Sequence, residues 1–210
     1  MPSAVTIDQL SDKLQRLRKR DTLRIVFGAA GHDYASTRAT EAELLALETH
    51  VGAALPEDYR VWLREVGYGA GPGYGLLSTR DAMAELRLDQ RGSGGDVDSA
   101  DLISDAHIRR YASAVSTAGT HIGIGITSNT FAGALPISHQ GCGNYSHIML
   151  AGHFRGAIFG EAGELIGEPW TAAAAFWPEP QLRGPTSDHH PASFLQWMDR
   201  WIEVSLALVN

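Results

Sequence analysis

The sequence has a single cysteine, Cys142, and no long apolar run among its 210 residues. One cysteine excludes an internal disulfide, so the reducing cytoplasm is the default compartment. No apolar run approaches the roughly 20 residues that a bilayer-spanning helix needs. Residues 1–20 also lack the continuous apolar core of a secretory signal peptide. We therefore expect a cytoplasmic protein with no membrane partner.

Positive charge is scarce outside the N-terminal segment. Residues 1–24 hold six basic and three acidic groups, whereas the rest of the chain holds 11 basic and 21 acidic groups, for a formal net charge of −7. The acidic part repels phosphate over a Debye length of about 8 Å at physiological salt. The charge therefore argues against nucleic acid as a direct ligand and favours a basic protein partner, although mild acidity also serves solubility. The basic side chains near the N-terminus form either a solvated helix face or a patch for an anion or an acidic partner: Lys13, Arg16, Arg18, Lys19 and Arg20.

Residues with the spacing of a catalytic, cofactor or metal site are also lacking. The glycine-rich run after Gly67 follows a helix pattern and has no Gly-Lys-Ser/Thr ending, unlike a phosphate-binding loop. His139, Cys142, His147 and His153 match no usual zinc spacing. A thiol nucleophile at Cys142 would need a histidine base beside it in space. We expect no enzyme, cofactor or metal site, with a small Cys/His hydrolase or transferase as an alternative.

Three capping boxes predict where helices begin. Each has a Ser or Thr whose partner Gln or Glu follows three residues later, just before apolar residues at helical spacing. The pairs are Thr6 with Gln9, Thr40 with Glu43, and Ser193 with Gln196. The stripes expected to face the core are Ile7, Leu10, Leu14 and Leu17; Leu44, Leu47 and Val51; and Phe194, Leu195, Met198, Trp201, Ile202 and Ser205.

The stretch at residues 55–77 predicts a further helix and a tight turn. Pro56 suits a helix start because its φ is fixed and it has no N–H. Gly67 suits the left-handed position after a helix, and a glycine-rich run leads on to two leucines. The apolar stripe of this helix follows the i, i+3, i+4, i+7 spacing: Tyr59, Trp62, Leu63 and Val66.

The later part of the chain changes to strand patterns. Residues 132–137, 145–151 and 156–161 are strand candidates joined by short glycine-bearing links, which predicts an antiparallel meander. Pro136 predicts an edge strand or a bulge. The short apolar run at 23–27 is a further possible strand. Other expected elements are helices at 78–88 and 101–115, a loop at 91–99, and a strand at 121–126.

Three ordered motifs carry a family resemblance. They are LPEDYRVWLREVG followed by GPGYGLL, GALPISHQGCGNYSHIML followed after a short gap by RGAIFGE, and the terminal SFLQWMDRWIE. Together they resemble the SUKH superfamily, which includes the fungal cell-wall-assembly regulator and many bacterial immunity proteins. The resemblance implies an α+β fold, with one domain over residues 1–210 whose mostly antiparallel central sheet is packed by N-terminal helices and a C-terminal helix. An irregular Pro/Ala-rich insert at about 168–191 departs from the family pattern.

The resemblance implies a non-enzymatic protein-binding module. We expect an immunity protein that binds and neutralises a basic, nuclease-type toxin of a polymorphic toxin system, as a monomer or a dimer. A regulatory or scaffolding protein of the cell-wall-assembly-regulator type is the alternative. Loop aromatics suit protein recognition, although they also cap cores, and acidic clusters steer basic partners. The expected partner-binding residues are Tyr68, Tyr74, Asp96, Asp98, Asp101, His139, Asn144 and Tyr145.

Overall fold

The computed structural model describes residues 5–92, 134–141, 144–151, 155–162, 165–169 and 192–209. The fold is α+β, with helices and small antiparallel sheets, as the sequence predicted. The elements expected at 101–115 and 121–126, and the insert from residue 170 onward, lie outside the described residues. Within the described residues, no helix combines the length and the apolarity needed to cross a bilayer.

All three capping boxes are confirmed. They open α1 (Ile7–Arg20), α3 (Glu41–Val51) and α7 (Phe194–Leu208), and in each the Ser or Thr oxygen accepts the backbone N–H three residues on. The buried residues of α1 are Leu10, Leu14 and Leu17, at the predicted spacing. The C-terminal helix α7 also buries Trp197, which the predicted stripe omitted. A short helix, α2 (Ala29–His32), and a short strand, β1 (Ser36–Thr37), separate α1 from α3.

The helix predicted within residues 55–77 is α4 (Glu57–Glu65), and aromatic contacts anchor it to α7. Trp62 and Leu63 are fully buried, and the rings of Tyr59 and Trp62 lie 5.0 and 5.8 Å from that of Phe194 in edge-on geometry. Such pairs contribute about 0.5–1.5 kcal/mol each beyond the area that they bury. Pro56 is the N-cap of α4, one position before its first helical residue. These contacts fix the end of the helix from which the glycine-rich turn begins.

The second half of the described chain forms a four-stranded antiparallel meander in the order β3-β4-β5-β6, as predicted for its first three strands. Its strands are β3 (Ala134–Gly141), β4 (Asn144–Met149), β5 (Ile158–Ala162) and β6 (Leu165–Pro169). Strand β3 is at the edge, and the register shifts after Pro136, so the proline prediction is confirmed. Strand β6 was not predicted, because its end was assigned to the proline-rich insert.

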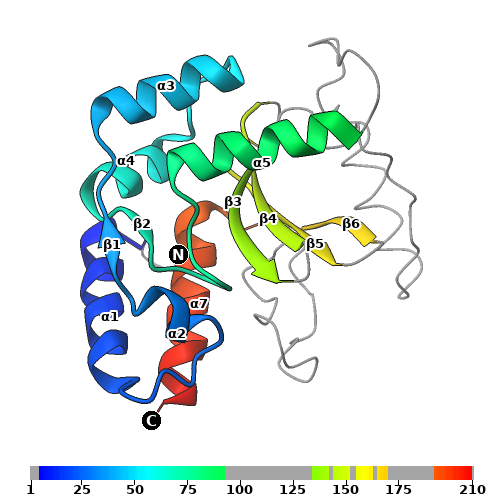
Figure 1. Cartoon of the computed structure of the whole chain (residues 1–210). Coiled ribbons are helices and arrows are strands. Elements are labelled where there is room, and N and C mark those ends of the chain that lie inside the picture. The colour runs from blue at the N-terminus through cyan, green and yellow to red at the C-terminus, as the bar shows by residue number, and fades with distance from the viewer. Residues whose placement is uncertain are drawn as a thin grey trace.

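Helices and sheet share one hydrophobic core. Leu135, Ile137, Ile148 and Ile158 are fully buried and join the cluster that contains the α1, α4 and α7 stripes. Figure 1 shows α1 and α7 side by side, with α7 on the side nearer the sheet, and α5 (Thr79–Gly92) crossing next to β3. The loop predicted at residues 91–99 is wrong for its first two residues, because α5 continues to Gly92, and its other residues lie outside the described part of the chain.

The strand predicted at residues 23–27 is wrong. This segment is a turn in which Arg24 has φ +54°. The buried carboxylate of Asp21 accepts the N–H groups of Ile25 at 2.8 Å and Val26 at 3.3 Å. A side chain has therefore taken the N–H groups that a neighbouring strand would have bonded, and Leu23 is left 84% exposed.

Candidate functional site

The glycine-rich turn after α4 folds back on itself and lies beside β3. Strand β2 (Tyr68–Gly69) pairs with β1, and Gly69 and Leu76 exchange backbone hydrogen bonds at 3.0 and 3.1 Å. At the tip, the Gly75 N–H donates to the Pro72 carbonyl at 3.0 Å, and Gly73 has φ +62°. Only glycine adopts such a φ at little cost, so the sequence fixes the turn at this position.

Three backbone segments approach one another closely around this tip. The Tyr74 N–H donates to the His139 carbonyl of β3 at 2.8 Å. A Cβ atom added at Gly28 would lie 1.7 Å from the Gly73 carbonyl oxygen, and one added at Gly73 would lie 2.4 Å from the His139 carbonyl oxygen. The segment before α2, the glycine-rich tip and the end of β3 are therefore stacked without room for side chains between them.

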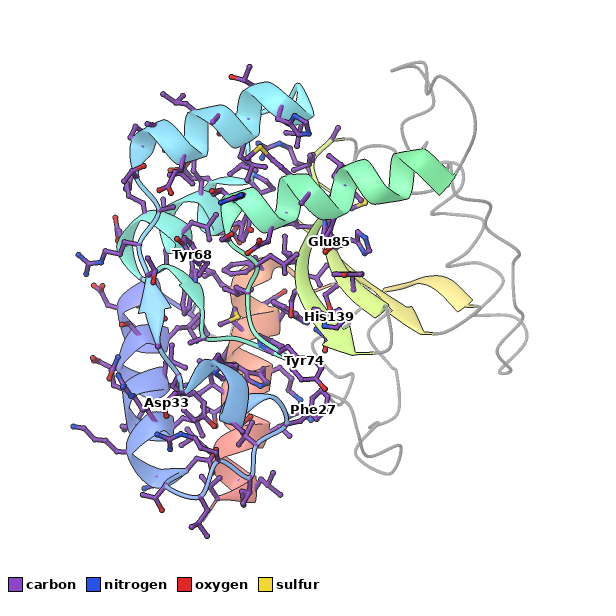
Figure 2. The ribbon with its side chains drawn as sticks, in the orientation of Figure 1. Phe27, Asp33, Tyr68, Tyr74, Glu85 and His139 are labelled. Carbon is purple, nitrogen blue, oxygen red and sulfur yellow. The ribbon has the colours of Figure 1, made fainter. Side chains whose placement is uncertain are left out.

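This stacking gathers an aromatic cluster, which we define as Phe27, Tyr74, His139 and Tyr145. Ring centroids are 5.2 Å apart for Phe27 and Tyr74, 5.4 Å for Tyr74 and His139, and 4.9 Å for His139 and Tyr145. Tyr74 is 53% exposed and Phe27 36% exposed, while His139 and Tyr145 are half-buried. Figure 2 shows Phe27, Tyr74 and His139 following one another along one edge of the described structure.

A buried polar layer in the sheet supports the cluster. Ser138 donates to the Pro72 carbonyl at 2.7 Å, and the Gln140 amide donates to the hydroxyls of Ser138 and Ser146 at 3.0 Å each. Burial lowers the pKa of the neighbouring His147 to about 3, so its imidazole is neutral at physiological pH. The hydrogen bonds of Ser138 and Gln140 tie β3 to the glycine-rich turn and to β4. The aromatic cluster therefore lies on a fixed base.

The structure brings together three of the expected partner-binding residues: Tyr74, His139 and Tyr145. It places Tyr68 elsewhere, in β2 opposite Thr37, partly buried against the core. Figure 2 shows Tyr68 well separated from Tyr74. Asn144 pairs with Gly141 in the β3–β4 ladder, and its side chain lies outside what the structure describes. Also outside are Asp96, Asp98 and Asp101, together with Cys142 and His153.

Phe27 is the member of the cluster that sequence reasoning missed. It ends the short apolar run that was interpreted as a strand, so it was expected in a sheet. The neighbouring Gly28, with φ +80° and no room for a Cβ atom, was the available signal of a turn. In the part of the chain that the structure describes, no three His, Cys, Asp or Glu side chains are grouped to hold a metal ion.

Comparison with models of known families finds no match, and comparisons with curated proteins and with solved structures find no significant match. The resemblance to the SUKH superfamily therefore stays a prediction from the three sequence motifs. The candidate site rests on the geometry of the aromatic cluster alone.

Proposed function

We propose that this chain is a protein-binding module of the immunity type, which binds a nuclease-type toxin in the cytoplasm and blocks it. The observation that carries the proposal is the exposed aromatic cluster around Tyr74. The SUKH-like motifs support it independently, because two of them contain Tyr74, His139 and Tyr145. No catalytic role is assigned to any residue of the cluster.

The cluster has the properties of a protein-binding hot spot. Tyrosine is enriched in such hot spots and buries a large area at low entropic cost. Here the backbone around Tyr74 is held before any partner arrives, by the His139 carbonyl and by the close approach of Gly28. Preorganisation of this kind reduces the entropy lost on binding. The cluster is thus suited to a partner that buries Tyr74 and Phe27 at the centre of an interface.

The charge of the chain indicates a basic partner. Beyond residue 24 the sequence holds 21 acidic and 11 basic groups, which favours association with a cationic surface such as the active cleft of a nuclease. The exposed face of a tyrosine ring also attracts Arg and Lys side chains. Inhibition follows from occlusion. When the aromatic cluster binds the rim of the toxin's cationic cleft, the body of this chain covers the cleft.

Co-purification with the product of the neighbouring gene tests the proposal, which expects that gene to encode a toxin. The tagged chain is co-expressed with the neighbouring gene product, and the mixture is examined by size-exclusion chromatography. We expect co-elution and loss of toxin activity in the complex. Separate elution, with the toxin still active, would refute the proposed function.

A further inference from the structure

A second exposed surface lies at the end of the α1–α7 pair. Leu23 is 84% exposed, Ile25 54% and Leu208 59%, although all three are large apolar residues. Arg16, Lys19 and Arg20 are exposed on one face of the last turns of α1, because they follow the i, i+3, i+4 spacing. We call these six residues the cationic end.

The two helices bring these residues to the same level. Lys13 of α1 forms ion pairs with Asp199 and Glu203 of α7. Figure 1 shows the two helices side by side, with the turn after α1 and the C-terminus at the same end. Arg20 lies about 10 Å beyond Lys13 at the helical rise, and Leu208 lies about as far beyond the midpoint of Asp199 and Glu203. Basic and apolar side chains therefore share one extremity of the described structure.

The turn at this end is rigidly held with its apolar side chains outward. The Asp21 carboxylate accepts hydrogen bonds from Ile25 and Val26 N–H and from the Tyr34 hydroxyl, the last at 2.6 Å. Val26 is buried as an anchor, so its neighbour Ile25 faces solvent. An exposed leucine and isoleucine on a fixed turn gain free energy when a partner removes them from water.

Two acidic residues lie at this turn, Asp21 and Asp33, and the basic side chains at this end of α1 outnumber them. Asp33 is exposed, but its carboxylate is paired with Arg24 at 2.5 Å and lies 3.7 Å from Arg18. Arg16 and Lys19 are exposed and add further positive charge at this end of α1. The acidic remainder of the chain is screened beyond about 8 Å at physiological salt, so a contact restricted to this end is dominated by positive charge.

We propose that the cationic end docks on the surface of an anionic lipid bilayer. Apolar side chains that project from a turn insert among lipid headgroups, and surrounding Lys and Arg side chains bind anionic lipids; together these are the two signals that peripheral attachment needs. Projecting side chains at an extremity fit a flat surface better than a groove of an acidic protein. This contact goes beyond toxin binding. It also departs from the sequence-based expectation of no membrane partner, which rested on the lack of a spanning segment and of a signal peptide and did not consider surface attachment.

Vesicle flotation of the full chain tests this inference. We expect binding to mixed phosphatidylserine–phosphatidylcholine vesicles that weakens with salt, and little binding to pure phosphatidylcholine. The Leu23→Ser/Ile25→Ser and Arg16→Glu/Lys19→Glu variants should each bind more than about tenfold more weakly. All four side chains are exposed, so thermal unfolding should be unchanged. Matched controls are Leu45→Ser on α3 and Arg64→Glu/Arg80→Glu on α4 and α5, which should bind like the parent chain.

Absence of binding to either vesicle would overturn the inference. An acidic protein would then be the better candidate partner for the cationic end. Equal weakening by the control variants would also overturn it, because the attraction would then not be localised. The test is independent of the proposed toxin binding, since every variant retains Tyr74 and the rest of the aromatic cluster. A chain that binds vesicles but no toxin would retain this inference and lose the proposed function.

Discussion

Tyr74 is joined to His139 twice, through its backbone and through its ring. Its N–H donates to the His139 carbonyl at 2.8 Å, and the two rings stack at 5.4 Å with 29° between their planes. The glycine-rich turn and the edge strand β3 therefore cannot move apart without breaking both contacts. An exposed tyrosine on such a support has little conformational freedom left to lose when a partner binds.

Gly28→Ala should destabilise the fold. Its Cβ would lie 1.7 Å from the Gly73 carbonyl oxygen, at a backbone φ of +80°, so we expect a loss of about 2–4 kcal/mol in the free energy of unfolding. Gly31→Ala is the matched control, because nothing lies within 4 Å of its added Cβ and it sits in helix α2. Urea denaturation of both variants checks this; equal stability of the two would show that the close approach is wrong.

Trp62→Ala should remove a main anchor of α4. Trp62 is fully buried against Phe194, with 5.8 Å between ring centroids, and truncation of a buried Trp costs about 3–5 kcal/mol. Leu45→Ala, on the exposed side of α3, should change stability by less than about 0.5 kcal/mol. Guanidinium unfolding curves separate the two. A Trp62→Ala variant as stable as Leu45→Ala would contradict the architecture.

Stability should fall as the pH is lowered below about 6.5. Burial lowers the pKa of His147 to about 3 and of His32 to about 4, whereas an unfolded histidine has a pKa of about 6.5. Between these values the unfolded chain binds more protons than the folded chain. The contribution of these histidines to the free energy of unfolding is therefore fully present above the unfolded pKa. It declines as the pH falls toward the folded pKa, by up to about 1.4 kcal/mol per pH unit for each histidine.

A His147→Leu variant isolates this contribution. Its free energy of unfolding should depend less steeply on pH between about 4 and 6, because unfolding takes up about one proton fewer than in the parent chain. This difference in slope does not depend on the absolute stability of the variant. His50→Leu is the control, because His50 is exposed on α3 in the folded chain. Urea titrations at a series of pH values measure the slope. An unchanged slope for His147→Leu would mean that His147 is charged or solvated in the folded state.

Local signals in the sequence predicted the helices well, because each capping box is complete within four residues. Thr6 with Gln9 needs no distant partner, and neither does the stripe around Trp62. The turn at 23–27 was mispredicted because the carboxylate of Asp21 captures its N–H groups and Arg24 takes a positive φ, which a non-glycine residue rarely does.

The candidate site was only partly predictable for a similar reason. Tyr74, His139 and Tyr145 were expected at a binding surface, but their contacts depend on segments that meet only after folding. The approach of Gly28 to Gly73 is such a contact, and it is what brings Phe27 to the cluster. The burial of both His147 and Ile148 could not be predicted either. Side chains alternate between the two faces of a strand, so one of these neighbours was expected to face solvent, whereas both are fully buried.

Isothermal titration calorimetry of the toxin domain against the chain and its Tyr74→Ala variant tests the central claim most directly. Tyr74 is 53% exposed, so the variant should fold normally, and Leu45→Ala serves as the control for an exposed side chain away from the cluster. We predict that Tyr74→Ala raises the dissociation constant by about 30-fold or more, as loss of a hot-spot residue does, while Leu45→Ala leaves it unchanged. Equal affinities for the parent chain and Tyr74→Ala would contradict the account.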